Sequence, residues 1–123
     1  MNKILLIEDD KDLAEALEIK LKKAGFEVSI AYNGEDGGKI AFSDKPDAII
    51  LDLILPGGKD GIELLKEIRA DDWGKNVPIL ILTNMDDIKH ISLAVEHKSN
   101  DYIVKSDTTL DEIVVRLKDR MHI

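Results

Sequence analysis

The chain has 123 residues, no cysteine and a formal net charge of −8 at pH 7. This length suits a single domain, residues 1–123, that buries roughly two thirds of the surface of its unfolded chain. The lack of cysteine excludes disulfides and thiolate metal sites, and the acidic balance disfavours binding to nucleic acid or anionic lipid. The first apolar run, residues 4–7, is too short for a signal sequence or a membrane span, so we expect a cytoplasmic protein without membrane or nucleic-acid partners.

Strand-like and helix-like stretches alternate five times along the chain. Continuous apolar runs or period-two alternation indicate strands, and apolar residues at three- and four-residue spacing indicate helices. The predicted strands are residues 4–7, 26–31, 48–51, 77–82 and 102–104, and the predicted helices are residues 12–24, 35–42, 60–68, 88–95 and 109–121. Alternating units of this kind predict an α/β fold, a doubly wound (βα)5 parallel five-stranded sheet with helices on both faces.

The helix over residues 35–42 is the weakest of these predictions. Gly37 and Gly38 together lower helix stability by about 2 kcal/mol relative to alanine, and we therefore expect this helix to be short or mobile. Two other helices begin with residues at capping-box spacing, which are Asp60 with Glu63 and Thr109 with Glu112.

Polar residues follow the apolar runs where the predicted strands end. Asp52 comes directly after residues 48–51, whose lack of polar alternation predicts a central strand covered on both faces. Strand ends of a parallel sheet meet at one edge, which is where open α/β sheets bind ligands. The polar residues placed at this edge are Glu8, Asp9, Asp52, Thr83 and Lys105. Each alone could be a helix cap or a solvated side chain, but together they predict one shared site.

Three carboxylates without histidine or cysteine predict a site for a hard cation. Carboxylates in contact repel one another, so they either raise a pKa or recruit a cation, and oxygen ligands with room for water suit Mg²⁺. A carboxylate beside such an ion can attack phosphorus and form an acyl phosphate. The metal, the Lys105 ammonium and the Thr83 hydroxyl could then compensate the added negative charge.

Five landmarks in chain order resemble the receiver domain of two-component response regulators. They are IEDD at 7–10, the strand that ends on Asp52, the following Pro56 with Asp60-Gly61, LTN at 82–84 and DYIVK at 101–105. The resemblance covers essentially the whole chain and implies a flavodoxin-like strand order, 2-1-3-4-5. It also implies a signalling phosphoacceptor rather than an enzyme, which catalyses only its own phosphotransfer and dephosphorylation. The phosphodonor would be a phosphohistidine on a sensor histidine kinase or a histidine phosphotransfer protein.

This resemblance implies a role for each residue of the site. Asp52 would be the phosphoacceptor, and Lys105 would pair with the phosphoryl group. Asp9 and Asp52 would bind Mg²⁺ directly, the backbone carbonyl of Ile54 would add a ligand, and Glu8 would act mainly through water.

A switch is implied as well. Thr83 would move toward the phosphoryl oxygens and Tyr102 would turn inward, which would change the face formed by the fourth helix, fifth strand and fifth helix. Contacts with the phosphoryl group would supply the free energy for this population shift, and a downstream protein would bind the changed face.

Four features depart from the usual pattern of the family. The loop PGGKDG at 56–61 is one residue longer, which would alter how the rim of the site closes. Ser106 replaces the usual proline after the lysine, so no cis bond is expected there and the loop that carries Lys105 would be looser. Asn84 replaces a smaller residue and would narrow access to the phosphoryl group, while Lys98 stands where glycine is common and would end its helix differently.

Two apolar residues bear on the lifetime of the acyl phosphate. By the resemblance, Ile54 and Met85 flank the path of an attacking water. Neither side chain can orient water by hydrogen bonding, so we expect a long-lived acyl phosphate that Met85→Glu would shorten.

Other classes of protein fit less well. A metal-dependent phosphatase would need a DxD motif after a strand and a cap domain, and a flavin or nucleotide module would need a phosphate-cradling loop where this chain has EDD at 8–10. A receiver-like interaction module that works without phosphorylation remains the alternative. A stand-alone receiver, a phosphorelay intermediate and part of a longer regulator are all compatible with these residues.

Overall fold

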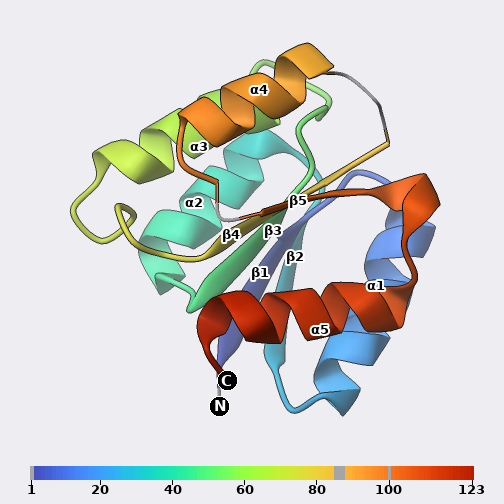
Figure 1. Cartoon of the computed structure of the whole chain (residues 1–123). Coiled ribbons are helices and arrows are strands. Elements are labelled where there is room, and N and C mark those ends of the chain that lie inside the picture. The colour runs from blue at the N-terminus through green and yellow to red at the C-terminus, as the bar shows by residue number, and fades with distance from the viewer. Residues whose placement is uncertain (1, 85–87, 100) are drawn as a thin grey trace.

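The computed structural model describes residues 2–84, 88–99 and 101–123, and within these ranges five strands alternate with five α-helices (Figure 1). The strands are β1 (Lys3–Ile7), β2 (Glu27–Ala31), β3 (Ala48–Leu51), β4 (Ile79–Thr83) and β5 (Asp101–Val104). The helices are α1 (Lys11–Lys23), α2 (Gly34–Asp44), α3 (Gly61–Ala70), α4 (Ile88–Glu96) and α5 (Leu110–Met121), and a short 3₁₀ helix, η1 (Lys105–Asp107), follows β5.

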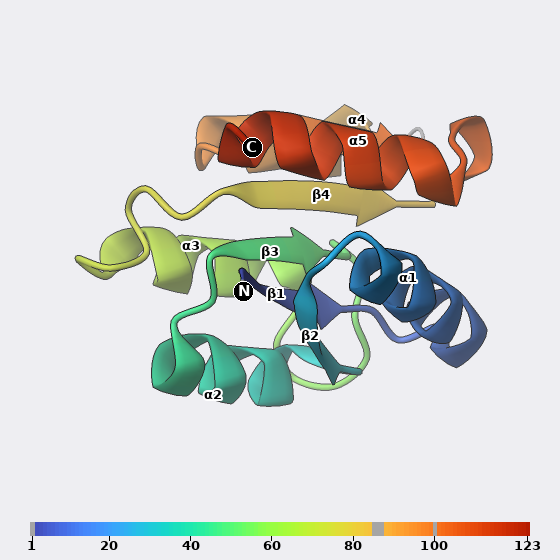
Figure 2. The same ribbon diagram turned by 90° about the horizontal axis from the view of Figure 1, so that it is seen from below.

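The strands form one parallel sheet in the order β2-β1-β3-β4-β5, which confirms the predicted fold class and strand order. Helices α2, α3 and α4 cover one face of the sheet, and α1 and α5 cover the other (Figure 1). Because β1, β3 and β4 run side by side in the same direction (Figure 2), their carboxyl ends lie at one edge. No helix within the described ranges combines the length and the apolar character needed to cross a bilayer.

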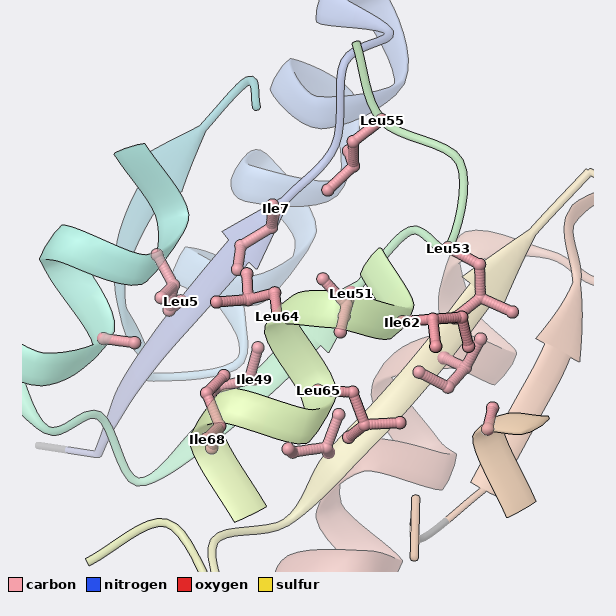
Figure 3. Close-up of a cluster of buried hydrophobic side chains, with 14 of the residues drawn as sticks. Leu5, Ile7, Ile49, Leu51, Leu53, Leu55, Ile62, Leu64, Leu65 and Ile68 are labelled. Carbon is pink, nitrogen blue, oxygen red and sulfur yellow. The ribbon is translucent and has the colours of Figure 1, made fainter. Parts of the chain in front are cut away.

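The central strand β3 supplies side chains to two hydrophobic clusters. Ile49 and Leu51 lie in the cluster beneath α2, α3 and α4 (Figure 3), whereas Ala48 and Ile50 lie in the cluster beneath α1 and α5. All four side chains are fully buried, and burying a leucine or isoleucine contributes about 2 kcal/mol. The uninterrupted apolar run is therefore explained by helices on both faces, as predicted.

The expectation of a short or mobile second helix is wrong in its length, because α2 has 11 residues. Asn33 caps it by accepting a hydrogen bond from the Asp36 backbone N–H at 2.8 Å. Gly37 and Gly38 are buried, and a Cβ added at Gly37 would lie 2.7 Å from Cδ1 of Ile7. The glycines therefore allow α2 to approach the sheet, and this packing outweighs their low helix propensity.

The capping box predicted from the sequence is complete at α5 and half formed at α3. Thr109 and Glu112 form the complete capping box, whereas at α3 only Asp60 makes its half, accepting from the Glu63 backbone N–H at 2.9 Å. Lys98 follows α4 with a φ of +62°, so a lysine occupies the left-handed position that favours glycine.

Candidate functional site

Two buried carboxylates lie side by side at the carboxyl edge of the sheet. Ile7 and Leu51 are paired in register, so Glu8 and Asp52 follow at the same level of adjacent strands. The backbone N–H of Asp52 donates to the Ile7 carbonyl at 2.9 Å, which extends the ladder beyond Leu51. Glu8 is 1 % exposed and Asp52 is 4 % exposed. The end of the ladder thus holds both side chains in the interior, where hydration is poor.

The three consecutive acids after β1 have three different environments. Glu8 points into the interior, Asp9 is exposed, and Asp10 is the N-cap of α1. Asp10 accepts a hydrogen bond from the Leu13 backbone N–H at 3.2 Å, and its own N–H donates to Oε2 of Glu8 at 3.1 Å. The start of α1 therefore fixes the Glu8 carboxylate and leaves Asp9 at the rim.

The predicted acidic cluster is formed. One carboxylate oxygen from each of Glu8, Asp9 and Asp52 lies within 4.8 Å of the other two. Such a spacing brings three hard ligands within reach of one small ion. The structure therefore brings together the three carboxylates that the sequence placed at this edge.

Lys105 lies at the start of η1 and joins the two buried acids. Its ammonium forms an ion pair with Oε1 of Glu8 and donates to Oδ2 of Asp52 at 3.1 Å. Burial works to lower the pKa of Lys105, but the hydrogen bond to Glu8 and the charges of both acids outweigh it and raise this pKa. The peptide bonds of the described residues are all trans, as expected from Ser106, and the segment after β5 forms the short helix η1.

The Glu8 carboxyl is the most perturbed acid of the site. Burial raises its pKa from 4.5 to about 7, although the ion pair with Lys105 and the Asp10 N–H work in the opposite direction. Oε1 of Glu8 is fully buried, and the Lys105 ammonium is its ionic partner. Glu8, Asp9 and Asp52 carry more negative charge than the single ammonium of Lys105 offsets, so the cluster fits a divalent cation with oxygen ligands.

The backbone at Ile54 contacts the central acid. Its N–H donates to Oδ1 of Asp52 at 3.1 Å, and its side chain is half exposed. Asp52 is thus held by Ile54 at one oxygen and by Lys105 at the other. The sequence predicted only the Ile54 carbonyl, and it gave no signal for this N–H because every residue except proline has the same backbone donor.

The two predicted switch residues lie on adjacent strands. Thr83 ends β4 and is buried, whereas Tyr102 on β5 is 41 % exposed and therefore lies outward. Asn84 follows Thr83 and is exposed. Met85, on which the lifetime prediction partly depends, lies outside the described residues.

Sequence analysis missed an ion-pair cluster at the start of β5. Asp101 accepts from Arg116 at 2.7 and 3.1 Å and pairs with Arg120 at 3.3 Å. Burial works to raise the pKa of Asp101, but the two guanidinium groups hold it below its usual value. The cluster ties β5 to α5, next to the face assigned to the downstream protein.

The doubly wound sheet carries an acidic cluster and a lysine at its carboxyl edge, which is where open α/β sheets bind ligands. The chain matches the family model described as response regulator receiver domain over residues 4–118. It therefore belongs to the receiver domain family of two-component response regulators, a family of signalling phosphoacceptors that interact with histidine kinases and downstream effectors.

Several solved structures similar to this chain are described as response regulators or receiver domains. A putative response regulator from Chloroflexus aurantiacus J-10-fl has 37 % identity and a TM-score of 0.90, with 99 % of this chain and 98 % of that chain covered. The activated N-terminal receiver domain of Klebsiella pneumoniae RstA, solved with BeF3, has 32 % identity and a TM-score of 0.87, with coverage of 99 % and 100 %. The receiver domain of the sensor histidine kinase PA1611 from Pseudomonas aeruginosa PAO1 has 29 % identity, a TM-score of 0.88 and coverage of 99 % and 98 %. It is described with a magnesium ion coordinated in the active site cleft.

Proposed function

We propose that Asp52 accepts a phosphoryl group from a phosphohistidine in a reaction that depends on Mg²⁺. The observation that supports this most directly is the environment of Asp52. This buried carboxylate lies within 4.8 Å of two other acids, and Lys105 and the Ile54 N–H contact its two oxygens. The Asp52 carboxylate is therefore a nucleophile that lies beside a place for a cation and beside two donors that can bind anionic oxygens.

The carboxylates of Asp9 and Asp52 and the carbonyl of Ile54 would hold the metal directly, and Glu8 would hold it mainly through water. When bound, the ion supplies positive charge that offsets the repulsion between the phosphoryl oxygens and the acids. The exposed position of Asp9 at the rim and the burial of Glu8 beside Asp52 support this assignment.

In the transfer step, an oxygen of Asp52 attacks phosphorus and forms the new P–O bond. The P–N bond to the donor imidazole breaks, and its electron pair returns to the ring nitrogen. Lys105 leaves Asp52 and pairs with a phosphoryl oxygen, which the Ile54 N–H also approaches, and the Thr83 hydroxyl moves toward the same group. The protein thus catalyses its own phosphorylation and, by attack of water on the acyl phosphate, its dephosphorylation.

The switch we propose converts this local charge into a change of surface. Inward rotation of Tyr102 would follow the movement of Thr83, because the two residues lie on the neighbouring strands β4 and β5. Val95 on α4, Tyr102 on β5 and Val115 on α5 are large apolar side chains with exposures of 57 %, 41 % and 65 %. A downstream protein would bind this α4–β5–α5 face. The kinase or phosphotransfer partner would bind the surface around Asp52, at the carboxyl edge of the sheet. We expect this signalling role to place the protein in the cytoplasm.

The test is intact mass after incubation with Mg²⁺ and acetyl phosphate, compared with Asp52→Asn, with the matched exposed variant Asp44→Asn and with a sample in EDTA. We expect one added phosphoryl group in the wild type and in Asp44→Asn, and none in Asp52→Asn or without metal. No gain in a folded wild-type protein, with acetyl phosphate and with a phosphorylated kinase, would favour the phosphorylation-independent interaction module.

A further inference from the structure

We propose that Gly34 and Lys59 are positioning residues that seat the β3–α3 loop, residues 52–60, and thereby aim the Ile54 carbonyl at the metal. The inference rests on the proposed function, because that function makes this carbonyl a ligand. It concerns the loop that, by the resemblance, we expect to be one residue longer than is usual in the family.

The inner end of this loop is closed by a glycine contact. A Cβ added at Gly61 would lie 2.6 Å from Cα of Leu53 and would overlap the carbonyl oxygen of Asp52. The Gly61 N–H also donates to the Leu53 carbonyl at 2.9 Å. The backbone at Gly61, where α3 begins, therefore packs directly against the backbone of residues 52–53, where the loop begins. Only glycine at position 61 allows so close an approach.

The outer end of the loop rests on α2. A Cβ added at Gly34, the first residue of α2, would overlap the carbonyl oxygen of Lys59 and would lie 3.0 Å from the carbonyl carbon. Both of these atoms belong to the backbone, so a rotamer change cannot relieve the overlap. An alanine at position 34 would have to displace the loop or the start of the helix.

The side chain of Lys59 makes a second attachment. Its ammonium binds Oε2 of Glu67 at 2.8 Å, and it would lie 3.9 Å from a Cβ added at Gly38. Glu67 belongs to α3, which lies beside α2 on the same face of the sheet (Figures 1 and 2). Lys59 therefore attaches the loop to both helices, with its backbone on α2 and its charge on α3.

Two glycines, Gly57 and Gly58, lie between the buried part of the loop and Lys59. Gly57 has a φ of +91°, and neither Gly57 nor Gly58 has any heavy atom within 4 Å of an added Cβ. Leu53 and Leu55 are buried, so a displacement at Lys59 reaches Ile54 as rotation of its peptide groups rather than as unfolding of the loop. Mg²⁺ requires near-ideal ligand geometry, and a rotated carbonyl loses it.

The test compares two alanine variants of the same helix. Gly34→Ala overlaps the loop backbone, whereas the Cβ of Gly38→Ala meets Cδ1 of Leu64 at 3.3 Å, a side-chain atom that can shift. Mg²⁺ affinity is measured by calorimetry, the Ile54 amide is followed by hydrogen exchange without metal, and folding is checked by circular dichroism. We expect Gly34→Ala to weaken Mg²⁺ binding about tenfold and to speed exchange at Ile54, and Gly38→Ala to match the wild type.

A second variant keeps the inference testable if Gly34→Ala does not fold. Lys59→Met retains the stem and removes the charge, and we expect a smaller loss of Mg²⁺ affinity, about threefold, with no further loss when Glu67→Gln is added. If Gly34→Ala folds and its Mg²⁺ affinity is unchanged, the inference is wrong while the proposed function stands. If Gly34→Ala does not fold, an unchanged Mg²⁺ affinity in Lys59→Met has the same meaning. A wild type that binds no Mg²⁺ would overturn the metal dependence of the proposed function instead. In that case, equal hydrogen exchange at Ile54 in Gly34→Ala and Gly38→Ala would also overturn the role of Gly34 in positioning the loop.

Discussion

Glu8→Gln tests the energetic cost of the buried acid. The folded-state pKa of Glu8 is raised from 4.5 to about 7, so the folded protein holds this proton over a range where the unfolded chain has lost it. A state that binds more protons loses relative stability as pH rises. The metal-free wild type should therefore lose stability between about pH 4.5 and pH 7 and level off above that range, and Glu8→Gln should lack this loss.

The size of the effect follows from the same values. Each pH unit between 4.5 and about 7 costs about 1.4 kcal/mol, so full ionisation of Glu8 costs about 3 kcal/mol. The assay is urea unfolding in EDTA from pH 5 to pH 8, followed by the fluorescence of Trp73, which packs partly buried against the core. The difference between wild type and Glu8→Gln isolates Glu8 from the other groups that titrate in this range.

Two results would refute this reasoning. One is a wild-type stability that does not fall from pH 5 to pH 7.5, and the other is the same slope in Glu8→Gln. Mg²⁺ supplies a further check, because an ion that binds the ionised cluster should stabilise the wild type more at pH 8 than at pH 5.

Three further predictions follow from other parts of the molecule. Asp101→Asn should lower stability by about 1 kcal/mol at pH 6, because the half-exposed arginines limit the value of the pairs. The pKa of Asp101 is depressed in the folded protein, so its contribution is fully present above the unfolded value of 3.8 and is lost as the pH falls below it, and the urea midpoints of the two proteins should converge on acidification. Gly37→Ala should destabilise by about 1 to 3 kcal/mol in urea unfolding, because its Cβ meets Ile7 at 2.7 Å, and Gly38→Ala should not. Met85→Glu should speed loss of the acyl phosphate in a timed mass measurement, and an unchanged decay rate would remove the lifetime hypothesis.

The fold could be predicted from the sequence where local pattern and burial agree. The four apolar residues of β3 predict a strand covered on both faces, and the structure buries all of them between two helical layers. The same logic failed for α2, because helix propensity is a local quantity. Gly37 lowers that propensity, yet its contact with Ile7, thirty residues earlier in the chain, decides the outcome. A single sequence carries no sign of such a distant contact.

In the candidate site, too, the features set by local sequence could be predicted and the contacts between distant residues could not. Its side chains could be placed at one edge because strand ends are visible in the sequence and parallel strands align their ends. The contacts made by backbone could not be predicted, as for the Ile54 N–H on Asp52 or the Lys59 carbonyl over Gly34. The Asp101 cluster was missed for a related reason, since its partners are on α5 and become neighbours only after that helix docks.

Glu8, Gly34 and Gly37 each violate a local rule, and the physical cause of each violation predicts a different response to substitution. Gly37 serves packing, so filling its position should lower stability. Glu8 is a buried acid that the fold holds at a cost, so Glu8→Gln should raise stability at neutral pH while it weakens cation binding, as expected where function opposes stability. Gly34 lies between these cases, because its contact is steric but the loop that it seats carries Ile54. Stability and Mg²⁺ affinity, measured together on the three variants, therefore separate the residues that build the sheet from those that build the site.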